Sequence, residues 1–243
     1  MTEENDSSLG GHPVAKRSLR EWIVRLLLLL LGLTIAHLGV SMFLLPGLGS
    51  DPFTIFVQGW AGIVGVSVGT FYVISMCLLM VVMLFTTKGY VLPGTVVCSF
   101  FGGPIIDGFA WLLGGHISPA SAMPIRIASV LVGCVVLSSG MALVIKSDAG
   151  AGANDLVSVI LTDKLKRFQF RWVRMSCDIF FSVTGFLLGG VLGIGTVVAV
   201  LLIGPVAQFF FPFWTRFVAG TVAWGVGGER VAVPANGEET NQK

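Results

Sequence analysis

Asp178 is the residue with the clearest potential for chemistry, because its carboxylate lies about two turns into the apolar stretch 172–190. Arg174 precedes it by four residues, which places both side chains on one face of a helix. A charged side chain inside a bilayer costs roughly 2.5–3.5 kcal/mol on insertion scales, so each one needs a partner or a function. Two interpretations stay open: a local ion pair that offsets this cost, or a carboxylate that binds a proton or another coupling cation.

Further polar residues follow two similar glycine turns, Gly47-Leu48-Gly49-Ser50-Asp51-Pro52 and Gly150-Ala151-Gly152-Ala153-Asn154-Asp155. Ser, Asp and Asn are favoured helix caps, and Pro is favoured in a first turn, so each turn predicts the start of a short helix. Such a start binds anions through its free N–H groups, unless the capping side chains use those groups themselves. Plain capping and a substrate or ion site between the two short helices therefore both remain open. The candidate binding residues are Ser50, Asp51, Thr54, Gln58, Asn154, Asp155, Ser158 and Asp178, and the candidate backbone breaks are Gly47, Gly49, Gly150 and Gly152.

Two prolines occupy equivalent places later in each half, in Gly103-Pro104 and Gly204-Pro205. A proline inside a helix frees a backbone carbonyl and favours a kink. The pair fits two gates that move against each other, and it fits equally well ordinary helix packing through small residues.

Composition makes this chain an integral membrane protein. Of its 243 residues, 54% are hydrophobic and 12% are charged, with a mean hydropathy of +0.89, whereas soluble domains carry about 25% charged residues. We expect no enzyme, because no Ser/His, His/Glu or paired-carboxylate arrangement is present. The glycine turns lack a Gly-Lys-Ser/Thr ending, which excludes ATP-driven transport by this chain alone. His37 has no ligand neighbours and the four cysteines lie in apolar runs, so we expect neither metal nor cofactor, and no nucleic-acid role.

Six stretches are long enough to cross a bilayer, which takes about 20 residues: 22–45, 69–87, 92–113, 126–146, 172–190 and 195–217. Two shorter segments, 52–64 and 154–166, lie between them. Gly94-Thr95-Val96-Val97 also returns as Gly195-Thr196-Val197-Val198, roughly a hundred residues later. We therefore predict an all-α membrane fold of six transmembrane helices and two short re-entrant or half-spanning helices, built as a 3+3 internal repeat.

Charge predicts that the second copy is inverted. The N-terminal Lys16, Arg17, Arg20 and Arg25 place that end in the cytoplasm. The second short helix ends near Lys164, Lys166, Arg167, Arg171 and Arg174, whereas the equivalent stretch 61–72 has no charge. A parallel repeat would need both short segments to cross, and Arg126 alone opposes the inverted arrangement. The predicted organisation is a cytoplasmic tail 1–21, a first repeat 22–113, an external loop 114–125, a second repeat 126–217 and a cytoplasmic tail 218–243.

The set of motifs resembles one family. It comprises the turn 47–52 with Gln58-Gly59, Gly65-Val66-Ser67-Val68-Gly69-Thr70, Gly94-Thr95 to Gly103-Pro104 with Asp107, Arg171, Arg174, Asp178, Gly189-Gly190, Gly193, Gly195-Thr196 and Gly204-Pro205 with Gln208. These motifs are similar to the YczE/YyaS/YitT group of bacterial membrane proteins, and most to its YczE branch. The chain departs from the pattern at Phe168-Gln169-Phe170 and in having Asp178 rather than Glu. The resemblance implies a multi-span bacterial inner-membrane protein of transporter type, without a named substrate.

Taken together, these features predict a secondary transporter or exporter that moves a small solute by alternating access, driven by an ion gradient. A channel or facilitator, with the short helices meeting as a filter, is the alternative, and a non-transporting scaffold that assists another protein is a third. The expected partners are a small-molecule or ion substrate and membrane lipids, and a homo-oligomer stays open.

Overall fold

The computed structural model describes residues 17–86, 91–165 and 170–225, and within these ranges its regular structure is entirely helical. The eight helices are α1 (Leu19–Leu44), α2 (Pro52–Val64), α3 (Val68–Thr86), α4 (Pro93–Leu113), α5 (Met123–Ser147), α6 (Ala153–Leu165), α7 (Phe170–Leu187) and α8 (Ile194–Gly225). The predicted all-α class is confirmed. The short segments predicted at 52–64 and 154–166 appear as α2 and α6, and residue 166 lies outside the described ranges.

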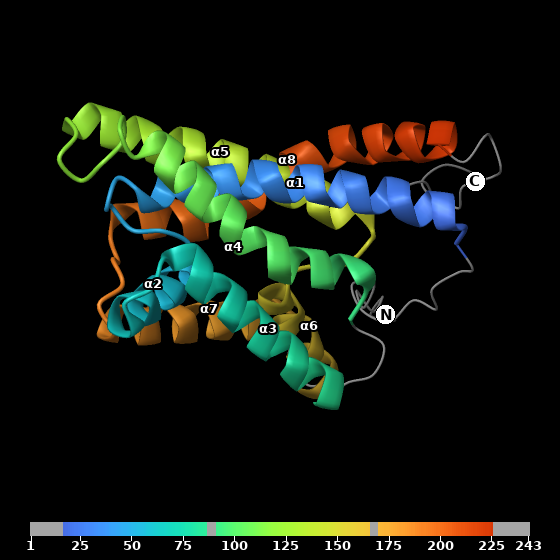
Figure 1. The fold of residues 1–243 in the computed structure, drawn as a ribbon, viewed down its shortest axis with the longest axis horizontal. Helices are drawn as coiled ribbons and strands as arrows, with labels where there is room; N and C mark the ends of the chain where they lie inside the picture. The colour runs from blue at the N-terminus through green and yellow to red at the C-terminus, as the bar shows by residue number, and fades with distance from the viewer. Residues whose placement is uncertain (1–16, 87–90, 166–169, 226–243) are drawn as a thin grey trace, which may run out of the picture.

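The helices form two bundles joined mainly by one contact (Figure 1). The first, which we call the core bundle, packs α1 on α5, α4 on α1 and α8 on α5. The second, the short-helix bundle, packs α2 on α7 and α3, and α6 on α7 and α3. The largest contact between the two bundles is that of α3 with α4.

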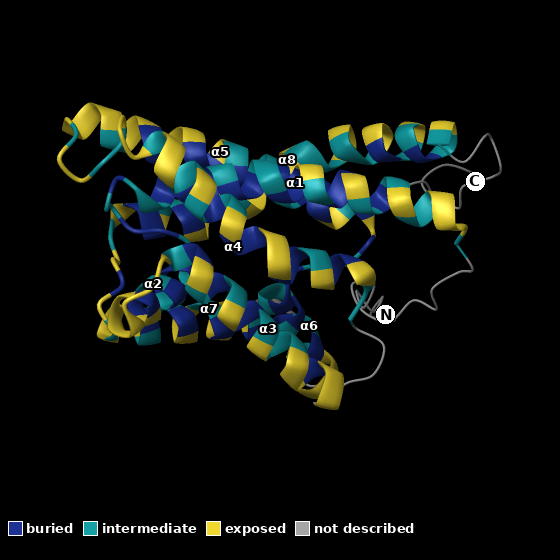
Figure 2. Cartoon of the chain, in the orientation of Figure 1, coloured by how far each residue is buried: buried dark blue, intermediate teal, exposed yellow. Residues whose placement is uncertain are grey.

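Five of these helices are long and apolar enough to cross a membrane: α1, α3, α4, α5 and α8. The sixth predicted span, α7, has 18 residues and carries Arg171, Arg174 and Asp178. Large apolar side chains lie on the outside of the molecule (Figure 2), among them Phe85, Trp111, Phe209 and Trp224. Apolar surface of this extent is typical of a protein surrounded by lipid. Helix α8 continues to Gly225, beyond the predicted end of the span at residue 217.

Glycines bring α1 and α5 into close contact at the centre of the core bundle. A Cβ atom added at Gly39 would lie 2.7 Å from Cα of Leu137, and one at Gly140 would lie 2.7 Å from Cα of Ala36. Gly140 also lies against the carbonyl of Gly32. The low-numbered part of α1 thus meets the high-numbered part of α5, so the two helices run antiparallel.

Two arginines make equivalent contacts at opposite ends of this antiparallel pair. Arg25 donates to the carbonyl of Ser147 over 3.0 Å, and Arg126 donates to the carbonyl of Pro46 over 2.9 Å. Arg25 and Arg126 have the same spacing in sequence as Pro46 and Ser147. Arg126, which opposed the charge pattern, therefore satisfies a carbonyl just beyond the C-terminal end of α1.

The glycine turns contact the opposite halves in the same reciprocal way. Gly94 donates its N–H to the carbonyl of Ala149 over 2.9 Å, and Gly195 donates to Leu48 over 2.8 Å. These contacts make Leu48 equivalent to Ala149. The two turns therefore align two residues away from the alignment of their glycines in the sequence. Gly49 (φ 100°) matches Gly150 (φ 142°), and Gly47 (φ 63°) matches Asp148 (φ 52°). The comparison by glycines alone missed this register, because an aspartate adopts the left-handed conformation at the second site.

Replacing Arg126 by Gln is expected to lower the free energy of unfolding by about 1–3 kcal/mol, since the Pro46 carbonyl loses a charged donor in a partly buried place. A thermal melt of the purified protein measures the effect. Arg216→Gln, on an exposed part of α8, is the matched control and should leave the melting temperature nearly unchanged. Equal losses in both variants would contradict the assigned contact.

Candidate functional site

The break between α1 and α2 is organised by Asp51. Its carboxylate accepts the N–H of Thr54 over 3.2 Å and the Ser50 hydroxyl over 3.3 Å, which caps α2, and Pro52 begins the helix. The predicted capping role of Asp51 is confirmed. Ser50 and Thr54 are buried beside it, whereas Gln58 accepts the N–H of Val191 over 2.8 Å and lies apart from this group.

The second break differs in its chemistry. Asn154 and Asp155 lie inside the first turn of α6, and Asp155 forms an ion pair with Arg174 over 2.7 Å, so the same capping role predicted for them is not what the structure shows. Arg174 also contacts Asp178 over 3.4 Å. The predicted pair of Arg174 and Asp178 is thus part of a larger group in which one guanidinium bridges two helices. The three side chains are 30–31% exposed, so the group can be reached from outside the protein.

We call Asp51, Asp155, Asp178 and Arg174 the acidic cluster. Phe53 and Phe181 follow Asp51 and Asp178 by two and three residues, and their rings pack edge-on with centroids 5.3 Å apart, so the α2 break lies near the α7 pair. The Arg174 guanidinium pairs with two of the three carboxylates, and the third, Asp51, caps α2. Ser158, also predicted for the site, is buried on α6. No group of three or more His, Cys, Asp or Glu residues suited to a metal ion occurs in the described ranges.

Tyr72 on α3 joins this cluster, although it was not among the residues predicted for the site. Its ring packs edge-on against His37 of α1, with centroids 5.2 Å apart, and against Phe53 of α2, with centroids 5.7 Å apart. Because Phe53 follows Asp51 by two residues, this contact places Tyr72 beside the α2 break. Little in the sequence distinguished Tyr72 as a site residue. It is one of only two tyrosines in the chain, and it lies near the start of an apolar span.

His37 lies buried between helices of the two bundles. Its Nδ1 donates to the carbonyl of Leu33 over 2.8 Å, and the ring is buried against Tyr72 and Gly102. The remaining ring nitrogen, Nε2, lies on the Gly102 side of the ring. This geometry places α1, α3 and α4 around the same point.

Thr95 forms the wall of the cluster on the core bundle. It is fully buried at the start of α4, and its hydroxyl has no hydrogen-bond partner in the part of the chain that the structure describes. Thr95 shares a face of α4 with Cys98 and Gly102, because the spacings are three and seven residues. Gly102 contacts Tyr72, and the backbone of Thr95 contacts Gly150 in the turn before α6. This face of α4 therefore looks towards the acidic cluster.

Asp107 links the two bundles near the end of α4. It accepts the N–H of Gly69 over 2.9 Å and also the Ser67 hydroxyl, so it caps the start of α3 from a neighbouring helix. Gly69 and Gly103 lie in contact beside it. Pro104 follows directly inside α4, and Pro205 lies inside α8 at the matching place.

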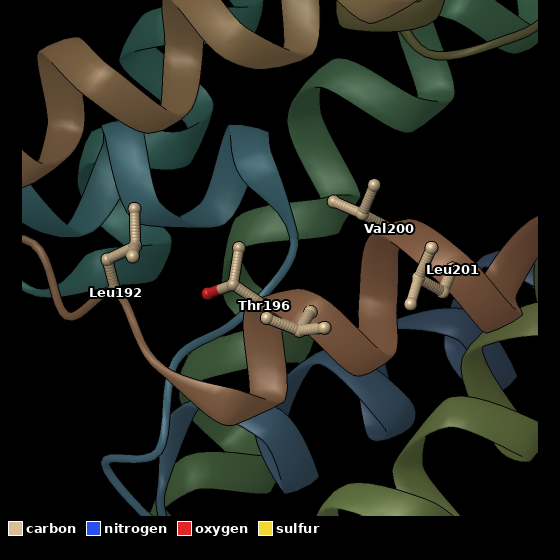
Figure 3. A pocket seen from close by; sticks show the side chains of 5 residues that line it. Leu192, Thr196, Val200 and Leu201 are labelled. Carbon is tan, nitrogen blue, oxygen red and sulfur yellow. The ribbon is translucent and has the colours of Figure 1, made fainter.

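The corresponding surface of α8 is uncovered. Gly204, which matches Gly103, has open space where a Cβ atom would be, and Gln208, which matches Asp107, is exposed. A shallow apolar cavity of about 260 Å³ lies at the start of α8, lined by Leu192, Thr196, Val197, Val200 and Leu201 (Figure 3). The contact of α3 with α4 thus has no equally extensive counterpart between α7 and α8 among the described residues.

Comparison with known proteins agrees with the motifs. The family of unknown function DUF6198 matches residues 23–212. An uncharacterized protein of Haemophilus influenzae is 32% identical over 193 residues, covering 78% of this chain and 84% of that protein. YyaS of Bacillus subtilis is 28% identical over 187 residues, covering 76% of this chain and 92% of YyaS. The membrane protein YczE of the same organism is 26% identical over 199 residues, covering 79% of this chain and 88% of YczE.

No solved structure matches the chain. The predicted YczE/YyaS resemblance is confirmed by both named relatives. The apolar helices and the family match lead to one conclusion: this chain is an integral membrane protein that belongs to the family of unknown function DUF6198.

Proposed function

We propose that the protein is a secondary transporter of a small solute, in which an inverted 3+3 repeat gives access to each side of the membrane in turn. The observation that carries this proposal is the reciprocal packing of the two halves. The contacts of Arg25 with Ser147 and of Arg126 with Pro46 exchange under a half-turn. Because α1 and α5 are antiparallel, that half-turn axis lies across the helices, as an inverted repeat requires.

Asymmetry between the halves supports alternating access. In the first half α3 closes on α4 through Ser67, Gly69 and Asp107. In the second half α7 stands away from α8, leaving Gly204 and Gln208 uncovered. A rocking motion of the short-helix bundle would exchange the first contact for the second, so that one side opens as the other closes.

The distribution of basic residues gives the proposed orientation. Arg17, Arg20 and Arg25 lie at the start of α1, and Lys164 lies at the end of α6, which packs on α7. Basic residues favour the cytoplasmic side. We therefore infer that both termini are cytoplasmic in a bacterial inner membrane, that the external side is closed, and that this structure faces inward.

Proteoliposome flux tests the transport proposal. The purified full chain is reconstituted with a pH-sensitive dye inside, and cationic, anionic and neutral solutes are added with and without a pH gradient. We expect at least one solute to move protons across the membrane, and Asp178→Asn to reduce that movement to the level of empty liposomes. Asp163→Asn removes a carboxylate from the exposed end of α6 and should leave the flux unchanged.

The other outcomes separate the alternatives. Full flux in Asp178→Asn with a lowered melting temperature would make the Arg174 pair structural and refute its coupling role. A flux whose rate does not depend on any ion gradient would favour a channel or facilitator. Absence of flux with any solute, together with a stable partner in a pull-down, would favour a scaffold.

A further inference from the structure

We propose that the acidic cluster is a binding site for a small organic cation, which takes the place that the Arg174 guanidinium occupies in this structure. The inference rests on the proposed transport function for its physiological meaning. Its geometry, however, stands on the cluster itself, so binding can be tested apart from transport.

The balance of charge points to a positive ligand. Arg174 contacts Asp155 over 2.7 Å and Asp178 over 3.4 Å, whereas Asp51 caps α2 and makes no ion pair among the described residues. One cation is therefore shared by two carboxylates. Charges taken out of water in an apolar protein are stable only when they are compensated, so the cluster favours a further cation over an anion.

One buried hydroxyl group beside the cluster, that of Thr95, has no hydrogen-bond partner among the described residues. The Thr95 side chain is fully buried at the start of α4. Buried polar groups are normally satisfied, so such a group calls for an explanation, and a ligand with N–H donors or a positive charge supplies one.

Aromatic rings lie within one turn of the carboxylates. Phe53 follows Asp51 by two residues, and Phe181 follows Asp178 by three. The Phe53 ring packs edge-on against Phe181, with centroids 5.3 Å apart, and against Tyr72 at 5.7 Å. Carboxylates beside aromatic rings suit organic ammonium ions, which gain both ion-pair and cation–π attraction.

The fold itself does not require the charges. Asp155, Arg174 and Asp178 have the matching residues Thr54, Val73 and Cys77 in the first half, at the spacing set by Gly94 and Gly195. None of those three is charged. An ion pair needed to hold this architecture would be expected in both halves, so its restriction to one half favours a role in binding.

The cluster also lies where a transported solute would have to bind. Thr95 belongs to the core bundle, whereas Tyr72, Asp155 and Arg174 belong to the short-helix bundle. A ligand held between the two would be exposed to alternate sides as the bundles rock, as in transporters with a site at the repeat interface.

Three isosteric probes test the sign of the charge: benzylammonium, benzyl alcohol and benzoate. Binding to the full chain in lipid nanodiscs is measured by calorimetry and by the shift in melting temperature, with empty nanodiscs as background. We expect benzylammonium to bind at least about tenfold more tightly than the other two probes, and Asp178→Asn and Asp155→Asn each to weaken it about tenfold or more. Asp163→Asn is the control with an unchanged affinity.

Arg174 gives a second, sharper test. Arg174→Gln removes the resident cation and is expected to raise the affinity for benzylammonium about tenfold or more, with a larger gain in melting temperature than in the natural protein. Arg174→Lys keeps a cation in place and should bind like the natural protein, which controls for misfolding. Equal binding of benzoate, or unchanged binding in Asp155→Asn and Asp178→Asn, would overturn the proposal.

Flux of the same probes separates this inference from the transport proposal. Benzylammonium that binds through Asp178 but never crosses the proteoliposome membrane would uphold the cation site and count against transport. Flux of anionic solutes that is indifferent to Asp178, without cation binding, would uphold transport and refute the cation site.

Discussion

Cross-linking α3 to α4 is expected to stop transport completely, and release of the link is expected to restore it. The pair Ser67→Cys and Asp107→Cys replaces two side chains that are hydrogen-bonded across the closed side. It is introduced after the native Cys77, Cys98, Cys134 and Cys177 have been replaced by serine. A short bifunctional methanethiosulfonate reagent joins the pair, and a reducing agent releases it.

The expected loss follows from the need to separate these helices. If the closed side must open in each cycle, a covalent link there traps the protein in one state, whatever the affinity for the solute. The measurement is proteoliposome flux before cross-linking, after it, and after reduction. The unlinked double variant shows how much the loss of the Asp107 hydrogen bonds contributes.

A link inside the core bundle is the matched control. The side chains of Ser139 and Trp214 are hydrogen-bonded over 3.2 Å, so Ser139→Cys and Trp214→Cys can be joined by the same reagent across α5 and α8. These helices keep their contact in both proposed states, and transport should therefore continue. Full transport with the α3–α4 link in place would show that α3 need not leave α4, and the rocking motion would be wrong.

Gly140→Ala is expected to destabilise the folded protein strongly, by roughly 1–3 kcal/mol or more. The added methyl group would lie 2.7 Å from both Cα of Ala36 and the carbonyl oxygen of Gly32. Both are backbone atoms, so no side-chain rotation relieves the contact and α1 must move away from α5. The size-exclusion profile and melting temperature of the purified protein measure the loss.

Replacing a glycine on an open face of α8 by alanine should not destabilise the protein. Gly220 lies within α8, and a methyl group added there would have no atom within 4 Å. Alanine is favoured over glycine in a helix by about 0.5–1 kcal/mol, so Gly220→Ala should leave stability unchanged or raise it slightly. A loss of similar size at both sites would mean that helix packing at Gly140 does not account for the effect.

Several features of the fold were predictable from the sequence because they depend on neighbouring residues. Apolar stretches of sufficient length predicted the helices, and Asp51 before Pro52 predicted the capped start of α2. The repeated Gly-Thr-Val-Val motifs predicted equivalent helix starts, and Gly94 and Gly195 indeed make matching contacts. Each of these features depends only on residues within a few helical turns along the chain.

The candidate site was predictable only in part. Asp51, Asp155 and Asp178 were recognised as charges that needed a reason in an apolar chain. Gln58 was expected among them, but it reaches the loop after α7 instead. Tyr72 and Thr95 were absent from the expected site, because an isolated tyrosine or threonine in an apolar helix has no distinctive spacing.

Residue types and local spacing by themselves determined that this is a helical membrane protein with a few costly internal charges, and they predicted an internal repeat. Only the tertiary structure decided that Arg174 bridges Asp155 and Asp178, and that Arg126 satisfies the Pro46 carbonyl. It also decided how the two glycine turns align, because Asp148 stands where the first turn has Gly47. The physical reason is that these contacts join helices far apart in the chain, and they depend on the direction and closeness of packing, which the spacing within one segment does not contain.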